Sequence, residues 1–222
     1  MIDAVVFDFD GLILDTEMPS FLSWVEVFEH FGCELHEDEH ALTIGAHFER
    51  IDLLKARARV ALPSDDDVRA IKQRRHAELL AEMEILPGVV TWLDEADALG
   101  LPLAIASSSP SSWVSGLLDR FELTGRFRHV VCCEDGRPPK PAPDCYLAAC
   151  DALGVAPANA LAVEDSANGV AAAKAAGLYC VAVPNRLTLR LDLSAADRQL
   201  ASLEEQTLAE VIEVIATTRG RA

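Results

Sequence analysis

Short apolar runs of strand length recur along this chain, and segments with helical spacing separate most of them. The runs lie at residues 2–9, 103–106, 129–133, 160–163 and 179–184, with a weaker candidate at 199–203. Continuous apolar strands that alternate with helices are typical of a mainly parallel sheet that is covered on both faces. The pattern therefore predicts an α/β fold with a doubly wound, mainly parallel sheet.

Two of the expected helices carry their own start and stop signals. Residues 110–121 place Pro110 at the first helical position, and Ser109 before it is a candidate cap. The Ala-rich segment 166–176 begins on a serine and is followed by Gly177. Glycine is common directly after the last helical residue, so this segment should end there.

The segment between residues 16 and 84 breaks the alternation of strands and helices. Its apolar residues follow helical spacing, as in Phe21, Trp24, Val25 and Phe28. A connection of this length is not a simple crossover loop. We therefore expect two domains, an α/β core formed by residues 1–15 and 85–222 and an inserted all-helical domain formed by residues 16–84.

The formal net charge of −17 limits the partners of this chain, because so acidic a surface repels nucleic acid and anionic membranes. The N-terminus lacks the basic start and apolar stretch of a signal peptide, and no apolar run approaches the roughly 20 residues that span a bilayer. We expect a cytoplasmic protein that binds neither nucleic acid nor membrane and acts as a monomer.

Polar side chains follow four of the expected strands, at the edge where open parallel sheets bind ligands. Each motif is unremarkable alone, since Asp-x-Asp, Ser-Ser-Ser and Lys-Pro also occur in ordinary turns and caps. Their repetition at four strand ends predicts a functional site. The residues concerned are Asp8, Asp10 and Gly11, then Ser107 and Ser108, then Lys140, and finally Glu164 and Asp165.

These side chains suit a metal ion and a phosphate group. Asp8 and Asp10 are two residues apart in an extended segment, which places both carboxylates on one side. Acids that converge at one edge repel each other unless a cation lies among them, and Mg²⁺ prefers such oxygen ligands. Lys140 and the hydroxyl of Ser107 add donors that suit phosphate oxygens.

Four segments resemble the signatures of the haloacid dehalogenase superfamily. They are Phe-Asp-Phe-Asp-Gly-Leu-Ile-Leu-Asp-Thr-Glu, Ile-Ala-Ser-Ser-Ser, Lys-Pro-Ala-Pro-Asp and Val-Glu-Asp-Ser-Ala-Asn-Gly. The resemblance covers residues 2 to about 184. The helical insertion after the first segment is similar to the cap of the subgroup that contains β-phosphoglucomutase, phosphoglycolate phosphatase and sugar-phosphate phosphatases, and it implies a Rossmann-like core with an inserted cap.

The resemblance also implies catalytic roles. Asp8 would be the nucleophile that carries an aspartyl phosphate, and Asp10 would protonate the leaving oxygen and then activate water. Ser107 and Lys140 would bind the transferred phosphoryl group. Mg²⁺ would be held by Asp8, the backbone carbonyl of Asp10 and Asp165, with Glu164 nearby or bound through water.

Substrate contacts are harder to assign, because the cap selects the substrate in this subgroup. The candidates are Gly11, Ser108, Glu17, His47 and Arg50. Trp113, like the other two tryptophans, falls at helical spacing with apolar residues, which favours packing over contact with a sugar.

We expect a phosphatase that acts on a small phosphorylated metabolite such as a sugar phosphate. One alternative is a hexose-phosphate mutase of the β-phosphoglucomutase type. Against it, Ser20 and Phe48 occupy the positions where that mutase has a cap-coupling histidine and a phosphate-binding arginine. A second alternative is an inactive protein that only binds phosphorylated ligands, which the complete set of acids, serine and lysine opposes.

Overall fold

The structure is a computed structural model, and it describes residues 1–42, 44, 50–134 and 136–219. The strands are β1 (Ala4–Phe7), β2 (Leu103–Ser107), β3 (His129–Cys132), β4 (Ala160–Glu164), β5 (Tyr179–Ala182) and β6 (Arg198–Gln199). The α-helices are α1 (Glu17–His30), α2 (Glu37–Ala41), α3 (Arg50–Arg57), α4 (Asp65–Ala81), α5 (Val89–Ala98), α6 (Ser111–Arg120), α7 (Asp144–Leu153), α8 (Ala167–Ala176) and α9 (Leu208–Arg219). Short 3₁₀ turns are η1 (Thr124–Arg126), η2 (Pro157–Asn159) and η3 (Thr188–Arg190).

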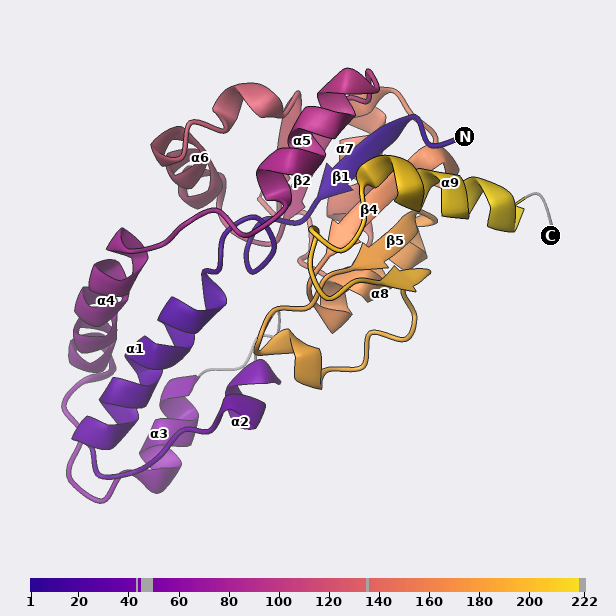
Figure 1. Cartoon of the computed structure of the whole chain (residues 1–222). Helices are drawn as coiled ribbons and strands as arrows, with labels where there is room; N and C mark the ends of the chain where they lie inside the picture. Colours follow the sequence, from indigo (N-terminus) through magenta and orange to yellow (C-terminus); the bar gives the residue numbers. More distant parts are fainter. Residues whose placement is uncertain (43, 45–49, 135, 220–222) are drawn as a thin grey trace.

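The described strands form one six-stranded sheet in the order β3-β2-β1-β4-β5-β6, and every neighbouring pair is parallel. The predicted doubly wound α/β fold is therefore confirmed (Figure 1). The strand order reverses between β1 and β4, which places these two strands side by side in the middle of the sheet. Ligands bind at such a switch point, beyond the carboxyl ends of the strands.

The two faces of the sheet bury side chains of different size. Larger residues such as Phe7 and Ile105 point toward a cluster that also contains residues of α5, α6 and α9. Small residues such as Ala104 and Ala162 point to the other face, where they pack with α7 and α8. Alternation of side chains along each strand produces this difference, and the small face lets the Ala-rich α8 approach the sheet closely.

Helices α1 to α4 build a separate cap with its own apolar core, which includes Trp24, Phe28 and Leu54. The cap lies beside the core domain, and α1 packs on α4 (Figure 1). The expectation of a helical insertion agrees with this arrangement, while the boundary at residues 16–84 stays a prediction. No helix in the described part of the chain is long and apolar enough to cross a membrane.

One loop of the core domain docks into the cap. Leu187, which follows β5, is fully buried in the apolar cluster of the cap. Arg186 and Arg190 on the same loop form ion pairs with Glu37 on α2. Asn168 on α8 donates a further hydrogen bond from the core to the cap, to the backbone oxygen of Ile44 over 3.3 Å. These contacts hold the cap over the carboxyl ends of the central strands.

Candidate active site

A cavity of about 240 Å³ lies between the central strand ends and the cap. The core side of its lining consists of Asp8, Asp10, Ser107, Ser108, Ser109, Trp113, Lys140, Asp165, Ser166 and Asn168. The side toward the cap consists of Thr16, Glu17, Ser20, Ile44 and His76. The cavity therefore brings together the acids, hydroxyls and lysine that the sequence places at different strand ends.

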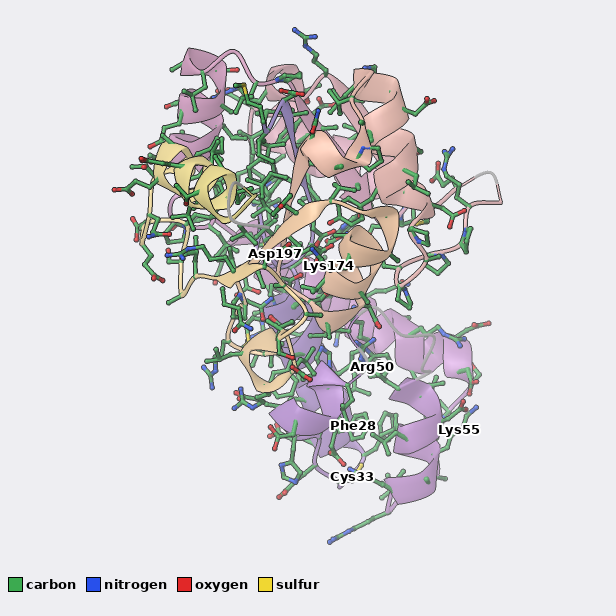
Figure 2. The ribbon with its side chains drawn as sticks, turned by 90° about the vertical axis from the view of Figure 1, so that its right-hand side faces the viewer. Phe28, Cys33, Arg50, Lys55, Lys174 and Asp197 are labelled. Carbon is green, nitrogen blue, oxygen red and sulfur yellow. The ribbon has the colours of Figure 1, made fainter. Side chains whose placement is uncertain are left out.

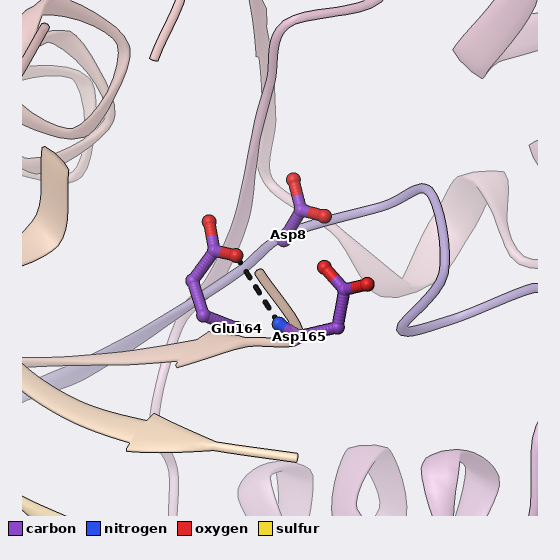
Figure 3. A group of neighbouring side chains, drawn as sticks. All are labelled: Asp8, Glu164 and Asp165. Carbon is purple, nitrogen blue, oxygen red and sulfur yellow. Dashed lines mark hydrogen bonds between the residues drawn. The ribbon is translucent and has the colours of Figure 1, made fainter. Parts of the chain in front are cut away.

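Asp8 and Asp165 lie next to each other because β1 and β4 are paired. The backbone amide of Asp8 donates to the oxygen of Val163 over 2.9 Å, which continues the ladder one residue beyond β1. Carboxylate oxygens of Asp8, Glu164 and Asp165 all lie within 4.8 Å of one another (Figure 3). Buried oxygen atoms at this spacing can hold a hard divalent cation such as Mg²⁺.

Lys140 reaches this acidic group from the segment that follows β3. Its ammonium donates to Asp8 Oδ1 and to Glu164 Oε1, each over 2.5 Å. Glu164 Oε1 also accepts from the Tyr146 hydroxyl, and its other oxygen accepts from the amide of Asp165 over 3.2 Å. Donors thus occupy both oxygens of Glu164, which is fully buried and orients Lys140 toward Asp8.

Three buried carboxyl groups share one ammonium group, that of Lys140, at this site. Burial raises the pKa of Asp8 to about 8, although Lys140 opposes that rise. Burial and the charge of Asp8 raise the pKa of Asp165 well above its usual range. For Lys140, burial lowers the pKa, but the charges of Asp8 and Glu164 outweigh it and hold the pKa above normal. A divalent cation beside Asp8 and Asp165 would favour their ionised forms, so the residues fit such an ion.

Asp10 is held in place by three side chains from two parts of the chain. Its Oδ1 accepts from the Thr16 hydroxyl over 2.8 Å and from Trp113 Nε1 over 2.9 Å, and its Oδ2 accepts from the Ser109 hydroxyl over 2.6 Å. Ser109 therefore does not cap the next helix as the sequence suggested. Helix α6 starts at Ser111, so Pro110 precedes the helix, and the Glu134 side chain accepts from the Ser111 amide over 2.7 Å at this end.

Ser107 and Ser108 shape the loop that follows β2. The amide of Ser109 donates to Ser107 Oγ over 3.0 Å, and the amide of Lys140 donates to Ser108 Oγ over 3.2 Å. Ser108 thus ties the loop of β2 to the segment that carries Lys140. Their roles toward a phosphate or a substrate stay predictions, as does that of Gly11, which adopts a φ of 81° close to Asp165.

Glu17 is the cap candidate that the structure places in the cavity. Burial and the charge of Asp10 raise the pKa of its carboxyl group to about 7. Arg50 lies at the end of the cap nearest the core (Figure 2), and its Nε donates to His40 Nδ1 over 3.2 Å. His47 and Phe48 lie outside the described residues, so their contacts stay predictions.

Sequence reasoning missed two aromatic residues of the cavity. Trp113 packs against the apolar core as the sequence predicts, and its indole nitrogen also donates to Asp10. His76 on α4 stacks on Trp113, with ring centroids 6.2 Å apart and an interplanar angle of 18°. Helical spacing could not reveal either role, because each residue also has apolar neighbours at helical spacing.

A substitution at Gly169 tests whether Glu164 positions Lys140. A Cβ atom at this position would lie 1.9 Å from Glu164 Oε2, so Gly169→Ala should displace the carboxylate and reduce kcat at least about tenfold. Gly116→Ala is the matched control, because it also lies in a helix but has nothing within 4 Å of the added Cβ. The control should keep full activity and unfold at an equal or higher temperature. Equal kcat values for the two variants would show that Glu164 does not position Lys140.

Comparison with known proteins agrees with this geometry. The model of the haloacid dehalogenase-like hydrolase family matches residues 2–177. The Bacillus subtilis protein YhcW is 39% identical over 96% of this chain and 97% of its own. Hexitol phosphatase B of Escherichia coli is 31% identical over 94% of this chain and 96% of its own.

The crystal structure of CbbY from Rhodobacter sphaeroides with phosphate is 31% identical, has a TM-score of 0.75, and covers 94% of this chain and 98% of its own. Another structure of CbbY contains xylulose-(1,5)bisphosphate. Family match, identity and shared fold all cover the segments that form the cavity. The chain belongs to the haloacid dehalogenase-like hydrolase family.

Proposed function

We propose that this protein is a Mg²⁺-dependent phosphatase that hydrolyses a small phosphorylated metabolite, such as a sugar phosphate, through an aspartyl phosphate on Asp8. One observation carries the proposal, namely that the Asp8 carboxylate, the Asp10 carboxylate and the Lys140 ammonium line the same cavity. Phosphoryl transfer needs a nucleophile, a proton donor and a positive charge, and these three side chains supply them in one cavity.

Asp8 and Asp165, with the backbone carbonyl of Asp10, would hold Mg²⁺, and Glu164 would act nearby or through water. The ion would supply positive charge that offsets the phosphoryl oxygens. Asp8 attacks phosphorus while Asp10 gives a proton to the leaving oxygen. Asp10 then takes a proton from the water that hydrolyses the aspartyl phosphate. Lys140 and Ser107 bind phosphoryl oxygens throughout and stabilise their charge.

The substrate class follows from the size and polarity of the cavity. About 240 Å³ suits a phosphate group with a small leaving group rather than a macromolecule. Glu17, Ser20 and Asn168 offer hydrogen bonds to hydroxyl groups. Two relatives, a hexitol phosphatase and a protein crystallised with xylulose-(1,5)bisphosphate, support a sugar phosphate. We place Gly11, Ser108, Glu17, His47 and Arg50 among the substrate contacts.

We also propose a cytoplasmic protein that acts as a monomer, and its net charge of −17 disfavours nucleic acid and anionic membranes as partners. The mutase alternative shares the aspartyl phosphate and differs only in what attacks it. Ser20 lines the cavity, and its hydroxyl does not change charge near neutral pH as the cap-coupling histidine of that mutase would. We therefore expect water to be the acceptor.

A panel of phosphate esters tests this proposal, with inorganic phosphate and sugar isomers measured together. Sugar phosphates and polyol phosphates should release inorganic phosphate. β-Glucose 1-phosphate, with catalytic glucose 1,6-bisphosphate added, should release phosphate or stay unchanged. Stoichiometric glucose 6-phosphate with little free phosphate would identify a mutase instead. Binding of the esters without any turnover would support the inactive, ligand-binding alternative.

A further inference from the structure

Trp113 makes the contact with Asp10 that the proposed mechanism leaves unexplained. The indole Nε1 donates to Asp10 Oδ1 over 2.9 Å, from the first turn of α6. The ring also lines the cavity beside the phosphoryl-binding residues. A tryptophan N–H can donate a hydrogen bond but cannot accept one. The oxygen that it contacts must therefore act as an acceptor whenever this bond is made.

This donor fixes which oxygen of Asp10 can carry a proton. A carboxylate oxygen has about two lone-pair sites, and those of Oδ1 are taken by Trp113 and by the Thr16 hydroxyl. Oδ2 accepts only from Ser109 among the described residues, and a serine hydroxyl can rotate and accept instead. The Thr16 hydroxyl can rotate in the same way, but the Trp113 N–H cannot. A proton on Oδ1 would weaken that oxygen as an acceptor for the indole, so the Trp113 bond favours the proton on Oδ2.

The indole is itself held by a residue of the cap. His76 lies on α4 and stacks almost parallel to Trp113, with 18° between the ring planes. Burial lowers the pKa of His76 to about 4, so the ring is neutral at physiological pH. Arg120, at the other end of α6, donates to the backbone oxygens of Leu80 and Ala81 at the end of α4, each over 2.7 Å. Two contacts thus set α6 against α4.

We propose that Trp113 is a positioning residue that keeps Oδ2 of Asp10 as the proton-donating oxygen, and that His76 supports it from the cap. The inference rests on the proposed function, since it concerns the proton that Asp10 gives to the leaving oxygen. Without the indole N–H, Oδ1 gains a free lone pair, and the carboxyl group can carry its proton on the wrong oxygen or rotate. Proton transfer to the leaving group then becomes less efficient, whereas the attack of Asp8 does not.

Leaving-group dependence separates these two effects. Alkyl phosphates, including sugar phosphates, have poor leaving groups that need a proton, whereas 4-nitrophenyl phosphate has a good one that needs little help. The ratio kcat/KM is the measure, because it reports steps up to and including phosphoryl transfer to Asp8. Trp113→Phe keeps an aromatic ring but removes the donor. It should lower kcat/KM at least about tenfold for the alkyl ester and less than about twofold for the aryl ester.

Trp92→Phe is the matched control. Trp92 Nε1 also donates over 2.9 Å, to the backbone oxygen of Gln206, but its ring is buried in the core and does not line the cavity. This variant loses the same kind of hydrogen bond and should unfold at a lower temperature. Its two kcat/KM values should change by the same factor, as expected of a structural effect alone.

His76→Ala should also lower kcat/KM more for the alkyl ester than for the aryl ester, by a smaller factor than Trp113→Phe. In an Asp10→Asn background, Trp113→Phe should cause no further loss with the alkyl ester, because the proton donor is already gone. A Trp113→Phe enzyme that hydrolyses both esters at unchanged or equally reduced kcat/KM would overturn this inference alone. A wild-type enzyme that hydrolyses neither ester would overturn the proposed function and the inference together.

Discussion

Replacing Asp8 with asparagine should reduce phosphatase turnover at least about 10³-fold while the protein stays folded. The amide has nearly the shape of the carboxylate but is a very poor nucleophile toward phosphorus. Folding should tolerate the change, because Asp8 is only 7% exposed and its burial as an anion is costly. Lys140 also donates to Glu164 over 2.5 Å, so the substitution should not leave its buried ammonium unpaired.

The measurement is kcat for a sugar phosphate and an aryl phosphate, with circular dichroism and thermal unfolding as controls of folding. Asp3→Asn is the matched substitution, since Asp3 lies just before β1 and contacts Asn159 outside the cavity. It should retain full activity. Beryllium fluoride with Mg²⁺ should inhibit the wild type by forming an aspartyl-phosphate mimic. A structure with that adduct on any residue other than Asp8 would overturn the mechanism.

The fold could be predicted from the sequence because periodicity reports burial directly. Continuous apolar runs mark strands that are covered on both faces, and β2 and β4, with all five residues of each buried, are the clearest cases. Because the strands are parallel, the residues that follow each strand lie at the same edge of the sheet. Asp8 and Asp165 are far apart in the sequence, yet the pairing of β1 with β4 brings them together as expected.

Contacts that depend on side-chain direction could not be predicted in the same way. The sequence places Glu164 near the expected metal site, but it does not reveal that the oxygens of Glu164 accept from Lys140, Tyr146 and the next amide. His76 and Trp113 meet only because α4 and α6 lie together across two domains. No local sequence pattern reports the angle between two helices, so the contact between His76 and Trp113 leaves no signal in the sequence.

Removal of Mg²⁺ by a chelator should reduce turnover at least about 100-fold, and excess Mg²⁺ should restore it. Lys140 is a single positive charge among the carboxylates of Asp8, Glu164 and Asp165, whose oxygens lie within 4.8 Å of one another. Without a cation these acids would repel a phosphate dianion when ionised, and the pKa of about 8 that burial gives Asp8 would leave it largely protonated and a poor nucleophile. A divalent cation reverses that balance and brings the phosphoryl group within reach of Asp8.

Asp165→Asn tests the same ion without relying on activity. Mg²⁺ that binds the folded state should stabilise the wild type by about 2.7 kcal/mol at a concentration 100 times its dissociation constant, which raises the unfolding temperature. The variant should need at least about tenfold more Mg²⁺ for the same shift. Asp197→Asn is the matched control, because Asp197 pairs with Lys174 away from the cavity, and its shift should equal that of the wild type. Full turnover in excess chelator, or an unchanged Mg²⁺ response in Asp165→Asn, would place the cation elsewhere and leave the buried carboxylates without their counterion.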